Sequence, residues 1–285
     1  MPPGAPREHD PRITVIQQEL FNEKRSKVDK YRELVVGQPG LWPLIRYELV
    51  MLVASWVPGA LGLFLRSKLF PLVLGKVGRN VVFGVNVTLR HPHKIQIGDN
   101  VVVDDQCCLD AKGTDNRGLF IGNGVFIGRN TILSCKNGDI IIEDHANLGF
   151  NCEIFSASRV RVGKSILMAA YTYLVGGDHL YDRVDIPVLD QGRTARGIDV
   201  GDGVWLGTHV VVTDGSTIGR DAIIGAGAVV VGEIPEFAIA TGIPAKVMRD
   251  RRGPADGNRQ TADGNEPADD APAAGSRQPA DGSAT

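Results

Sequence analysis

The sequence predicts an all-β solenoid, in which short strands wind into coils that stack along one axis. The first observation is a six-residue repeat over residues 200–230, where an aliphatic residue opens each unit and a glycine usually follows. The second is the length of that unit, because six residues supply one short strand and one tight turn, and three units close a triangular coil of about eighteen residues. The third is composition, since 43% of the 285 residues are hydrophobic, enough to fill a large core.

The repeat predicts which side chains face the core. Side chains alternate along a strand, so the opener of a unit and the residue four positions later both point toward the axis. A single coil cannot bury its own apolar side, and several coils must therefore stack. The sequence predicts about seven coils. Their first residues are Val77, Ile97, Ile121, Ile142, Val162, Val200 and Ile218.

The segments before the coils have a different character. Residues 1–12 are polar and proline-rich and are expected to be disordered, whereas residues 13–76 form a helical and hydrophobic segment. An apolar stripe among charges predicts a helix over residues 13–36. Residues 49–65 contain no charge and are interrupted by Pro58 and Gly59, a run too short and too broken for a membrane-spanning helix.

Two interpretations of residues 41–74 remain open. In one, a pair of short helices lies in a membrane interface, with Trp42, Tyr47 and Trp56 at headgroup depth and with Arg66 and Lys68 against anionic lipid. In the other, the helices cover the open end of the solenoid, because the terminal edges of a repeat array need protection.

The β-helix domain is expected to span residues 77–250. Spacings above eighteen residues indicate insertions near residues 113–118, 137–138 and 157–158 and a large one over residues 176–197. A long loop on a rigid scaffold is a typical location of functional residues. Residues 251–285 contain no large aliphatic or aromatic residue and are expected to form a disordered tail.

Charge and cysteine content narrow the functional classes. The net charge is −2 and the repeats contain no long basic cluster, which argues against nucleic-acid binding. The four cysteines have no CxxC spacing, and Cys107 and Cys152 fall on inward positions of their units. No apolar core of a signal peptide follows the first residues, so a reduced, cytoplasmic protein is expected.

Three motifs resemble one family. The stretch Val-Trp-Leu-Gly-Thr-His over residues 204–209, Ile-Gly-Ala-Gly over residues 224–227 and Thr-Gly-Ile-Pro-Ala-Lys-Val-Met-Arg over residues 241–249 are similar to segments of the hexapeptide-repeat acyltransferases. That family includes galactoside, maltose and xenobiotic acetyltransferases. The resemblance implies a left-handed parallel β-helix, acetyl-CoA as co-substrate, and a homotrimer with active sites between neighbouring subunits.

The resemblance also implies roles for individual residues. His179 follows Gly-Gly-Asp at the start of the large insertion and corresponds to the family's general base, a task that imidazole suits near neutral pH. Trp205 would pack on the acceptor sugar or on the pantetheine arm, and Thr208 would meet the thioester end. Ala226 would offer backbone contact to pantetheine. The alternative interpretations are a solvent-exposed loop histidine and a tryptophan that covers a subunit interface.

The closing motif implies phosphate contacts for Lys246 and Arg249, because coenzyme A carries a pyrophosphate and a 3′-phosphate. By the same resemblance Asn151 and Ser156 would line the acceptor pocket. This chain has Ser156-Ala157 where the sugar acetyltransferases have acidic residues, which weakens the match to a specific sugar.

The imidazole of His179 has several candidate orienting partners, namely Glu153, Asp178, Asp185 and Asp190. A zinc-dependent carbonic anhydrase shares the fold and uses three histidines. The other candidate histidines here are too scattered to predict a metal site; they are His91, His93, His145 and His209.

The function expected from these observations is an acyl-CoA-dependent O-acyltransferase that acetylates a hydroxyl of a saccharide or of a lipid-linked glycan precursor in polysaccharide biosynthesis. Transfer is expected to be direct, because no serine or cysteine lies in a nucleophile-elbow context. The alternatives are a non-catalytic, membrane-associated scaffold and an N-acetyltransferase or serine acetyltransferase. The expected location is the cytoplasm, with peripheral contact to the inner membrane face through residues 41–74.

Overall fold

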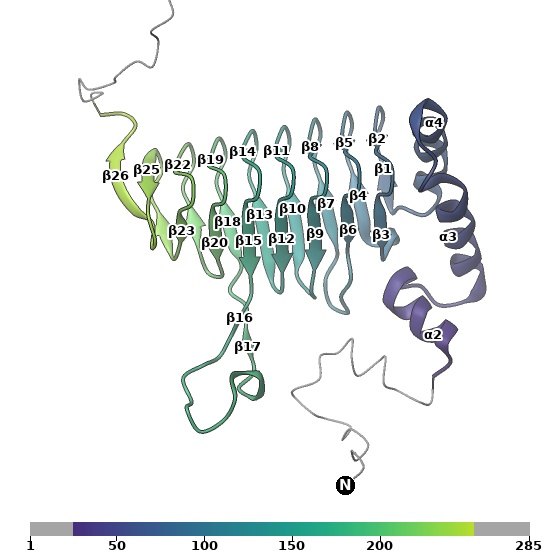
Figure 1. Ribbon diagram of the computed structural model, residues 1–285, viewed down its shortest axis with the longest axis horizontal. Helices are drawn as coiled ribbons and strands as arrows, with labels where there is room; N and C mark the ends of the chain where they lie inside the picture. Colours follow the sequence, from purple (N-terminus) through teal and green to yellow (C-terminus); the bar gives the residue numbers. More distant parts are fainter. Residues whose placement is uncertain (1–24, 254–285) are drawn as a thin grey trace, which may run out of the picture. The chain divides into compact units, whose positions relative to one another are not determined.

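The structure is a computed structural model, and it describes residues 25–253. A helical region precedes the strands and comprises α2 (Lys27–Tyr31), a π-helical turn (Arg32–Val36), α3 (Leu41–Ala54), α4 (Gly59–Leu69) and a 3-10 turn (Phe70–Leu72). The following strands form three parallel sheets that share one core, as Figure 1 shows. The prediction of a parallel β-solenoid is therefore confirmed.

Each coil contributes one strand to each sheet, except the last, which contributes to two of them. Sheet 1 contains β1 (Lys76–Val77), β4 (Ile95–Ile97), β7 (Leu119–Ile121), β10 (Asp139–Ile142), β13 (Arg159–Val162), β18 (Ile198–Val200), β21 (Thr217–Ile218) and β24 (Glu233–Ile234). Sheet 2 contains β2 (Val82–Phe83), β5 (Val102–Val103), β8 (Phe126–Ile127), β11 (Asn147–Leu148), β14 (Leu167–Met168), β19 (Trp205–Leu206), β22 (Ile223–Ile224), β25 (Ala238–Thr241) and the antiparallel closing strand β26 (Lys246–Asp250). Sheet 3 contains β3 (Thr88–Arg90), β6 (Cys108–Asp110), β9 (Ile132–Cys135), β12 (Glu153–Ser156), β15 (Tyr173–Gly176), β20 (Val211–Thr213) and β23 (Val229–Val230).

The predicted openers are aligned in sheet 1. All seven lie directly opposite one another, from Val77 through Ile218, in consecutive strands. The row continues to Ile234, which begins an eighth coil among the described residues. Proline rather than glycine follows Ile234, and this departure from the repeat is why the sequence predicted about seven coils. Cys107 and Cys152 are buried in the core, as predicted.

The first coil is covered by the helical region, which packs against β2 and β3. Arg66 is 1% exposed, and its guanidinium donates hydrogen bonds to the backbone carbonyls of Phe83, Ala54 and Val57. Burial lowers the pKa of Arg66. The hydroxyl of the buried Tyr47 donates to the Leu89 carbonyl. The prediction that Arg66 and Tyr47 face lipid is therefore wrong, because both side chains tie the helices to the first coil.

The remaining expectations have mixed outcomes. The helix predicted over residues 13–36 is present over residues 27–36, and its earlier part lies outside the described residues. The expectations for residues 1–12 and for residues 254–285 also lie outside them. Among residues 25–253, no helix has the length and the apolar character that crossing a membrane requires.

The large insertion forms a hairpin of β16 (Asp178–His179) and β17 (Arg193–Thr194), with a short 3-10 turn (Val188–Asp190) between them.

Candidate active site

Two of the predicted coenzyme residues lie at the corner between sheet 2 and sheet 3. Thr208 and Ala226 occupy equivalent exposed positions in consecutive coils. The backbone N–H of Gly227 donates to the Thr208 carbonyl at 2.8 Å, which holds the two turns one above the other. The Thr208 hydroxyl donates to the Ala170 carbonyl of the coil before, at 2.8 Å. The corner therefore presents small side chains and backbone along the axis of the solenoid.

The next residue of each turn at this corner has a left-handed backbone. Asn151, Tyr171, His209 and Gly227 occupy this position in four consecutive coils, with φ between 55° and 71°. Asparagine and glycine adopt this conformation at low cost, whereas a bulky tyrosine does so rarely. The exposed rings of Tyr171 and His209 stack with centroids 4.9 Å apart. The sequence reasoning missed Tyr171, although aligning the turns of successive coils places it between Asn151 and His209.

A β-bulge brings the two predicted phosphate ligands to one face. Residues three apart in a regular strand point to opposite faces. In β26, Lys246 lies opposite Thr241 and Arg249 lies opposite Ile239, because the register shifts between Ile239 and Ala240. Thr241 and Ile239 share the outer face of sheet 2, so Lys246 and Arg249 share it as well. Within residues 25–253 neither cation has an ion-pair partner, and both are exposed.

Trp205 belongs to the same surface. It points outward from β19, is 48% exposed, and lies in a row that continues through Ile223 and Ile239 to Arg249. Three strand spacings separate Trp205 from Arg249, which corresponds to about 14 Å. An exposed aromatic ring, a corner of small residues and two exposed cations thus follow one another along one side of the solenoid.

The candidate base is on the hairpin. His179 lies opposite Arg193, and its backbone N–H donates to Oδ1 of Asp178 at 2.7 Å. The ring Nδ1 of His179 is buried and has no hydrogen-bond partner among the described residues. The carboxylate of Asp185 is paired with Arg183. None of the four candidate carboxylates is therefore seen to orient the imidazole within residues 25–253.

Sheet 3 separates the hairpin from the corner that carries Thr208. Figure 1 shows the hairpin leaving the solenoid at the end of β15, whereas Tyr171 precedes the start of that strand. Four residues of strand cover about 13 Å. Within one chain, His179 and the predicted coenzyme residues therefore lie at opposite edges of sheet 3.

The two residues predicted to line the acceptor pocket, Asn151 and Ser156, lie in different environments. Asn151 is partly exposed at the corner, where a ligand can reach it, and its role stays a prediction. Ser156 is fully buried and its hydroxyl donates to the Asp139 carbonyl at 2.8 Å. The prediction that Ser156 lines an acceptor pocket is wrong, because alternation along β12 points this side chain into the core together with Ile154.

The cysteines are poor nucleophiles in this environment. Burial raises the pKa of Cys107 and that of Cys135 to about 12. Burial also raises the pKa of Cys108 and of Cys152. A thiol needs its thiolate form to attack a thioester. The cysteine environments therefore agree with direct transfer rather than with a covalent acyl-cysteine.

No group of three or more metal-ligating side chains is placed to hold an ion in the part of the chain from residue 25 to residue 253. The histidines considered as metal ligands do not form such a group. His91, for example, lies 2.9 Å from the Glu33 carbonyl through Nε2, and burial lowers its pKa.

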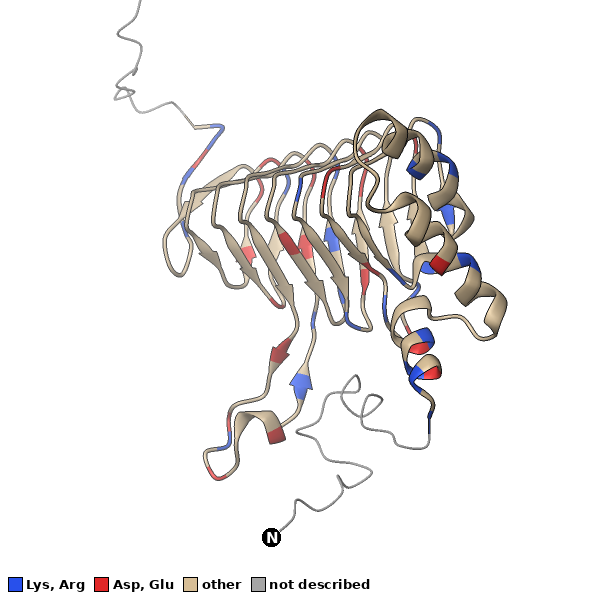
Figure 2. Ribbon diagram, turned by 45° about the vertical axis from the view of Figure 1, so that its right-hand side comes forward, with Lys and Arg blue, Asp and Glu red and all other residues tan. Residues whose placement is uncertain are grey.

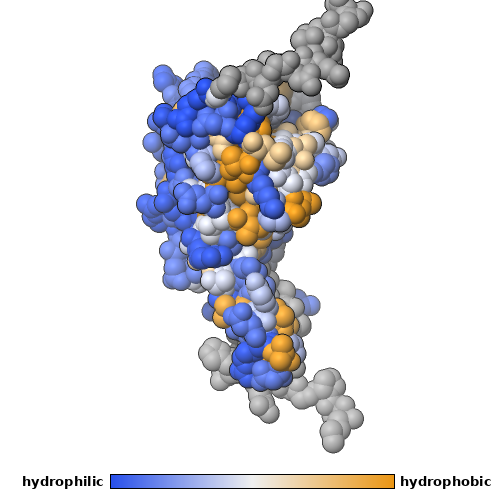
Figure 3. All heavy atoms as spheres, turned by 90° about the vertical axis from the view of Figure 1, so that its left-hand side faces the viewer, coloured by the Kyte–Doolittle hydropathy of each residue, from blue (hydrophilic) through white to orange (hydrophobic). Residues whose placement is uncertain are grey.

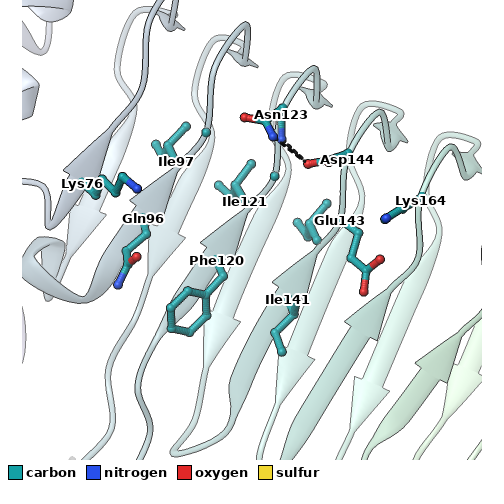
Figure 4. A pocket seen from close by; sticks show the side chains of 13 residues that line it. Lys76, Gln96, Ile97, Phe120, Ile121, Asn123, Ile141, Glu143, Asp144 and Lys164 are labelled. Carbon is teal, nitrogen blue, oxygen red and sulfur yellow. Dashed lines mark hydrogen bonds between the residues drawn. The ribbon is translucent and has the colours of Figure 1, made fainter.

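A shallow depression lies on a different face of the solenoid. Its lining comes from sheet 1 and the adjoining turns and includes Lys76, Phe120, Glu143 and Lys164, as Figure 4 shows. The Asn123 side chain donates to Asp144 beside it. None of the predicted catalytic, coenzyme or acceptor residues lines this depression, so it is not the predicted site.

Comparison with known proteins identifies the repeats. Residues 197–232 match the family model described as bacterial transferase hexapeptide (six repeats), and residues 76–104 match the hexapeptide repeat of succinyl-transferase. Among curated relatives, a probable acetyltransferase of Mycobacterium tuberculosis, Rv3034c, is 37% identical over 134 residues, covering 47% of this chain and 45% of that protein. The galactoside O-acetyltransferase of Escherichia coli is 32% identical over 134 residues, covering 45% of this chain and 55% of the relative.

The chain thus spans about half the length of these two relatives. Among solved structures, the polysialic acid O-acetyltransferase OatWY matches with a TM-score of 0.50 at 18% identity, covering 62% of this chain and 86% of the other. This likeness supports the fold alone.

Proposed function

The chain belongs to the hexapeptide-repeat family, and we propose that it is an acyl-CoA-dependent O-acyltransferase that acetylates a hydroxyl of a saccharide or of a lipid-linked glycan precursor. The observation that carries the proposal is the alignment along sheet 2. Trp205, the corner residues Thr208 and Ala226, and the exposed Lys246 and Arg249 follow one another on one side of the solenoid. A long, flexible thioester with phosphates at one end fits such a row.

The chemistry assigns a role to each part of the row. The cations bind the coenzyme's phosphates, while the small side chain at Ala226 leaves room beside the corner. His179 accepts the proton of the acceptor hydroxyl as its oxygen attacks the thioester carbonyl. The acyl group passes to that oxygen, and the proton on His179 returns to the departing thiolate. The raised pKa values of the buried thiols favour this single displacement.

The bulge in β26 yields a prediction about coenzyme binding. Lys246→Ala or Arg249→Ala is expected to raise the KM for acetyl-CoA about tenfold and to leave the acceptor KM and kcat nearly unchanged, because the phosphates do not react. Steady-state kinetics at low and high salt measure the effect, which should shrink as salt screens the charges. Arg117→Ala is the matched control, since Arg117 is an exposed cation beside sheet 1. Equal KM values for all three variants would remove the phosphate role.

The separation of His179 from the coenzyme corner supports a homotrimer with shared sites. The hairpin carries apolar side chains that are exposed in the single chain, and Figure 3 shows some of them at its tip. They are Leu180, Tyr181, Val184, Val188 and Leu189. A neighbouring copy would cover these side chains and receive His179 at its own corner. We therefore propose that each active site contains residues from two subunits.

Subunit mixing tests this arrangement. The test combines a His179→Ala protein, which has a low kcat, with a Lys246→Ala/Arg249→Ala protein, assayed at acetyl-CoA concentrations well below the raised KM of the latter. Co-expressed with different tags and purified through both tags, the two are expected to regain activity, because some sites then combine an intact hairpin with an intact corner. Sedimentation should give three copies per particle. Mixed particles that are no more active than the mean of the two parents, or a fully active monomer, would exclude the shared site.

The functional class itself is decided by thioester consumption. A thiol-release assay with acetyl-CoA against sugars, sugar nucleotides, amino sugars and serine should show acceptor-dependent release with a hydroxyl acceptor. Release only with amino sugars or with serine would favour the N-acetyl or serine-type alternative. No release with any acceptor would favour a non-catalytic scaffold. A lipid-linked acceptor would place the enzyme on the cytoplasmic face of the inner membrane.

A further inference from the structure

Helix α3 is apolar on two opposite sides. Its buried residues Tyr47, Val50 and Ala54 face the first coil. At about 100° per residue, Trp42, Ile45, Leu49, Leu52 and Trp56 fall within an arc of about 100° on the other side of the helix and its C-terminal extension. All five are exposed, with Trp42 70% and Leu52 69% accessible. A helix that is hydrophobic all round is normally covered on both sides, and α3 is covered on only one.

Helix α4 extends the same exposed surface. Leu61 and Phe64 are exposed, whereas Gly62 and Arg66 on the opposite side are buried. We call the surface formed by Trp42, Leu49, Leu52, Trp56, Leu61 and Phe64 the cap face. Scattered exposed leucines are ordinary, but a group on two helices that contact each other, with two tryptophans among its members, marks an interaction site.

The exposure of the cap face does not come from loosely attached helices. Three backbone carbonyls hold the guanidinium of Arg66, and the Ser55 carbonyl accepts a hydrogen bond from the backbone N–H of Asn86. These bonds join the helix pair to the first coil. The cap face is therefore a preformed surface that points away from the coils.

The charges of the cap helices are mostly basic, with Glu48 on α3 as the acidic exception; it accepts a hydrogen bond from the Tyr31 hydroxyl. No aspartate or glutamate occurs between Glu48 and Asp99. Six lysines and arginines lie in that interval, of which Arg66 is buried and Arg79 and Arg90 are paired with Asp99 and Asp110. Lys68 and Lys76 are exposed. Figure 2 shows basic residues and no acidic ones along α4. The α4 part of the cap face carries Lys68 and no acidic residue, so pressing two copies together through α4 would bring like charges into contact, which disfavours a second copy as the partner.

We propose that the cap face docks on an anionic lipid bilayer. The leucines and Phe64 would enter the acyl boundary, and Trp42 and Trp56 would lie at headgroup depth, where tryptophan is favoured. Lys68 and Lys76 would attract the anionic headgroups. The inference does not depend on the acyltransferase activity. In the proposed trimer with parallel solenoids, three cap faces would point to the same side and bind together.

Vesicle flotation of the full-length protein tests the proposal. The wild type is expected to float with phosphatidylglycerol-containing vesicles at low salt and less at high salt or with pure phosphatidylcholine. Leu49→Glu/Leu52→Glu should reduce the bound fraction at least about tenfold, because each side chain loses its apolar burial. Lys68→Glu should weaken binding to the anionic vesicles. Val231→Glu is the matched control, since Val231 is 62% exposed between β23 and β24, far along the chain from the cap.

Contact is read directly from fluorescence. Brominated lipids should quench Trp42 and Trp56 in a Trp205→Phe protein, in which they are the two remaining tryptophans. A wild type that stays unbound at low salt, or bound vesicles that leave these tryptophans unquenched, overturns the proposal. A wild-type particle that Leu49→Glu/Leu52→Glu splits into smaller ones, without any vesicle binding, would instead assign the cap face to a second copy. Unchanged circular dichroism of the variants confirms that they are folded.

Discussion

Replacement of His179 by alanine is expected to reduce turnover by about 10² to 10⁴ while the protein stays folded. This range is typical for the loss of a positioned general base. The residue lies on an exposed hairpin outside the core, so the change leaves the coils intact. Within residues 25–253 no group hydrogen-bonds the buried Nδ1 of the ring, so this chain's described residues do not orient the imidazole.

The measurement separates kcat from KM and includes a matched histidine. Both KM values should change little, because His179 acts on the proton that moves during the reaction. His145→Asn is the control: His145 is an exposed histidine with a left-handed backbone between β10 and β11, and asparagine tolerates that conformation. A His179→Ala enzyme with near-normal kcat, or an equal loss in His145→Asn, would contradict the assignment.

Replacement of Arg66 by alanine is expected to destabilise the helical cap by about 3–5 kcal/mol. The change removes three charge-assisted hydrogen bonds, leaves the carbonyls of Phe83, Ala54 and Val57 without that donor, and opens a cavity beside β2. Unfolding by denaturant, followed by tryptophan fluorescence, measures the cost, because Trp42 and Trp56 lie on the cap.

Lys68→Ala provides the comparison, since Lys68 is exposed on the same helix and a surface substitution of this kind usually changes stability by less than about 0.5 kcal/mol. Arg66→Lys should fall between the two, because an ammonium group has no planar fork with which to reach all three carbonyls. Equal stability of the Arg66→Ala and Lys68→Ala proteins would show that the buried guanidinium does not hold the cap.

The periodic part of the molecule was predictable from the residues. Aliphatic openers recur at a regular interval, and side-chain alternation along each strand determines which residues reach the axis, so Val77 and Ile218 were assigned correctly to one row. The corner motifs were predictable for the same reason. Thr208 and Ala226 occupy the same position of successive units, and stacking of the units brings them together.

The departures from the period could be decided only by the tertiary structure. The family resemblance placed Ser156 in an acceptor pocket, yet alternation along β12 turns its side chain into the core. Lys246 and Arg249 point to the same face of sheet 2 only because a β-bulge interrupts the alternation of side chains along β26. Their common role therefore depends on pairing with β25, which no local pattern encodes.

The sequence by itself determined the repeating coil, the position of the hairpin and the composition of the cap. Each follows from local chemistry, namely the spacing of aliphatic residues, the length of an insertion, and a long run without acidic side chains. Only the tertiary structure decided that Arg66 is buried while Trp42 is exposed, because burial depends on which distant backbone meets each face of a helix. It also separated His179 from the coenzyme corner by the width of sheet 3, because the hairpin follows one end of β15 and the corner precedes the other end.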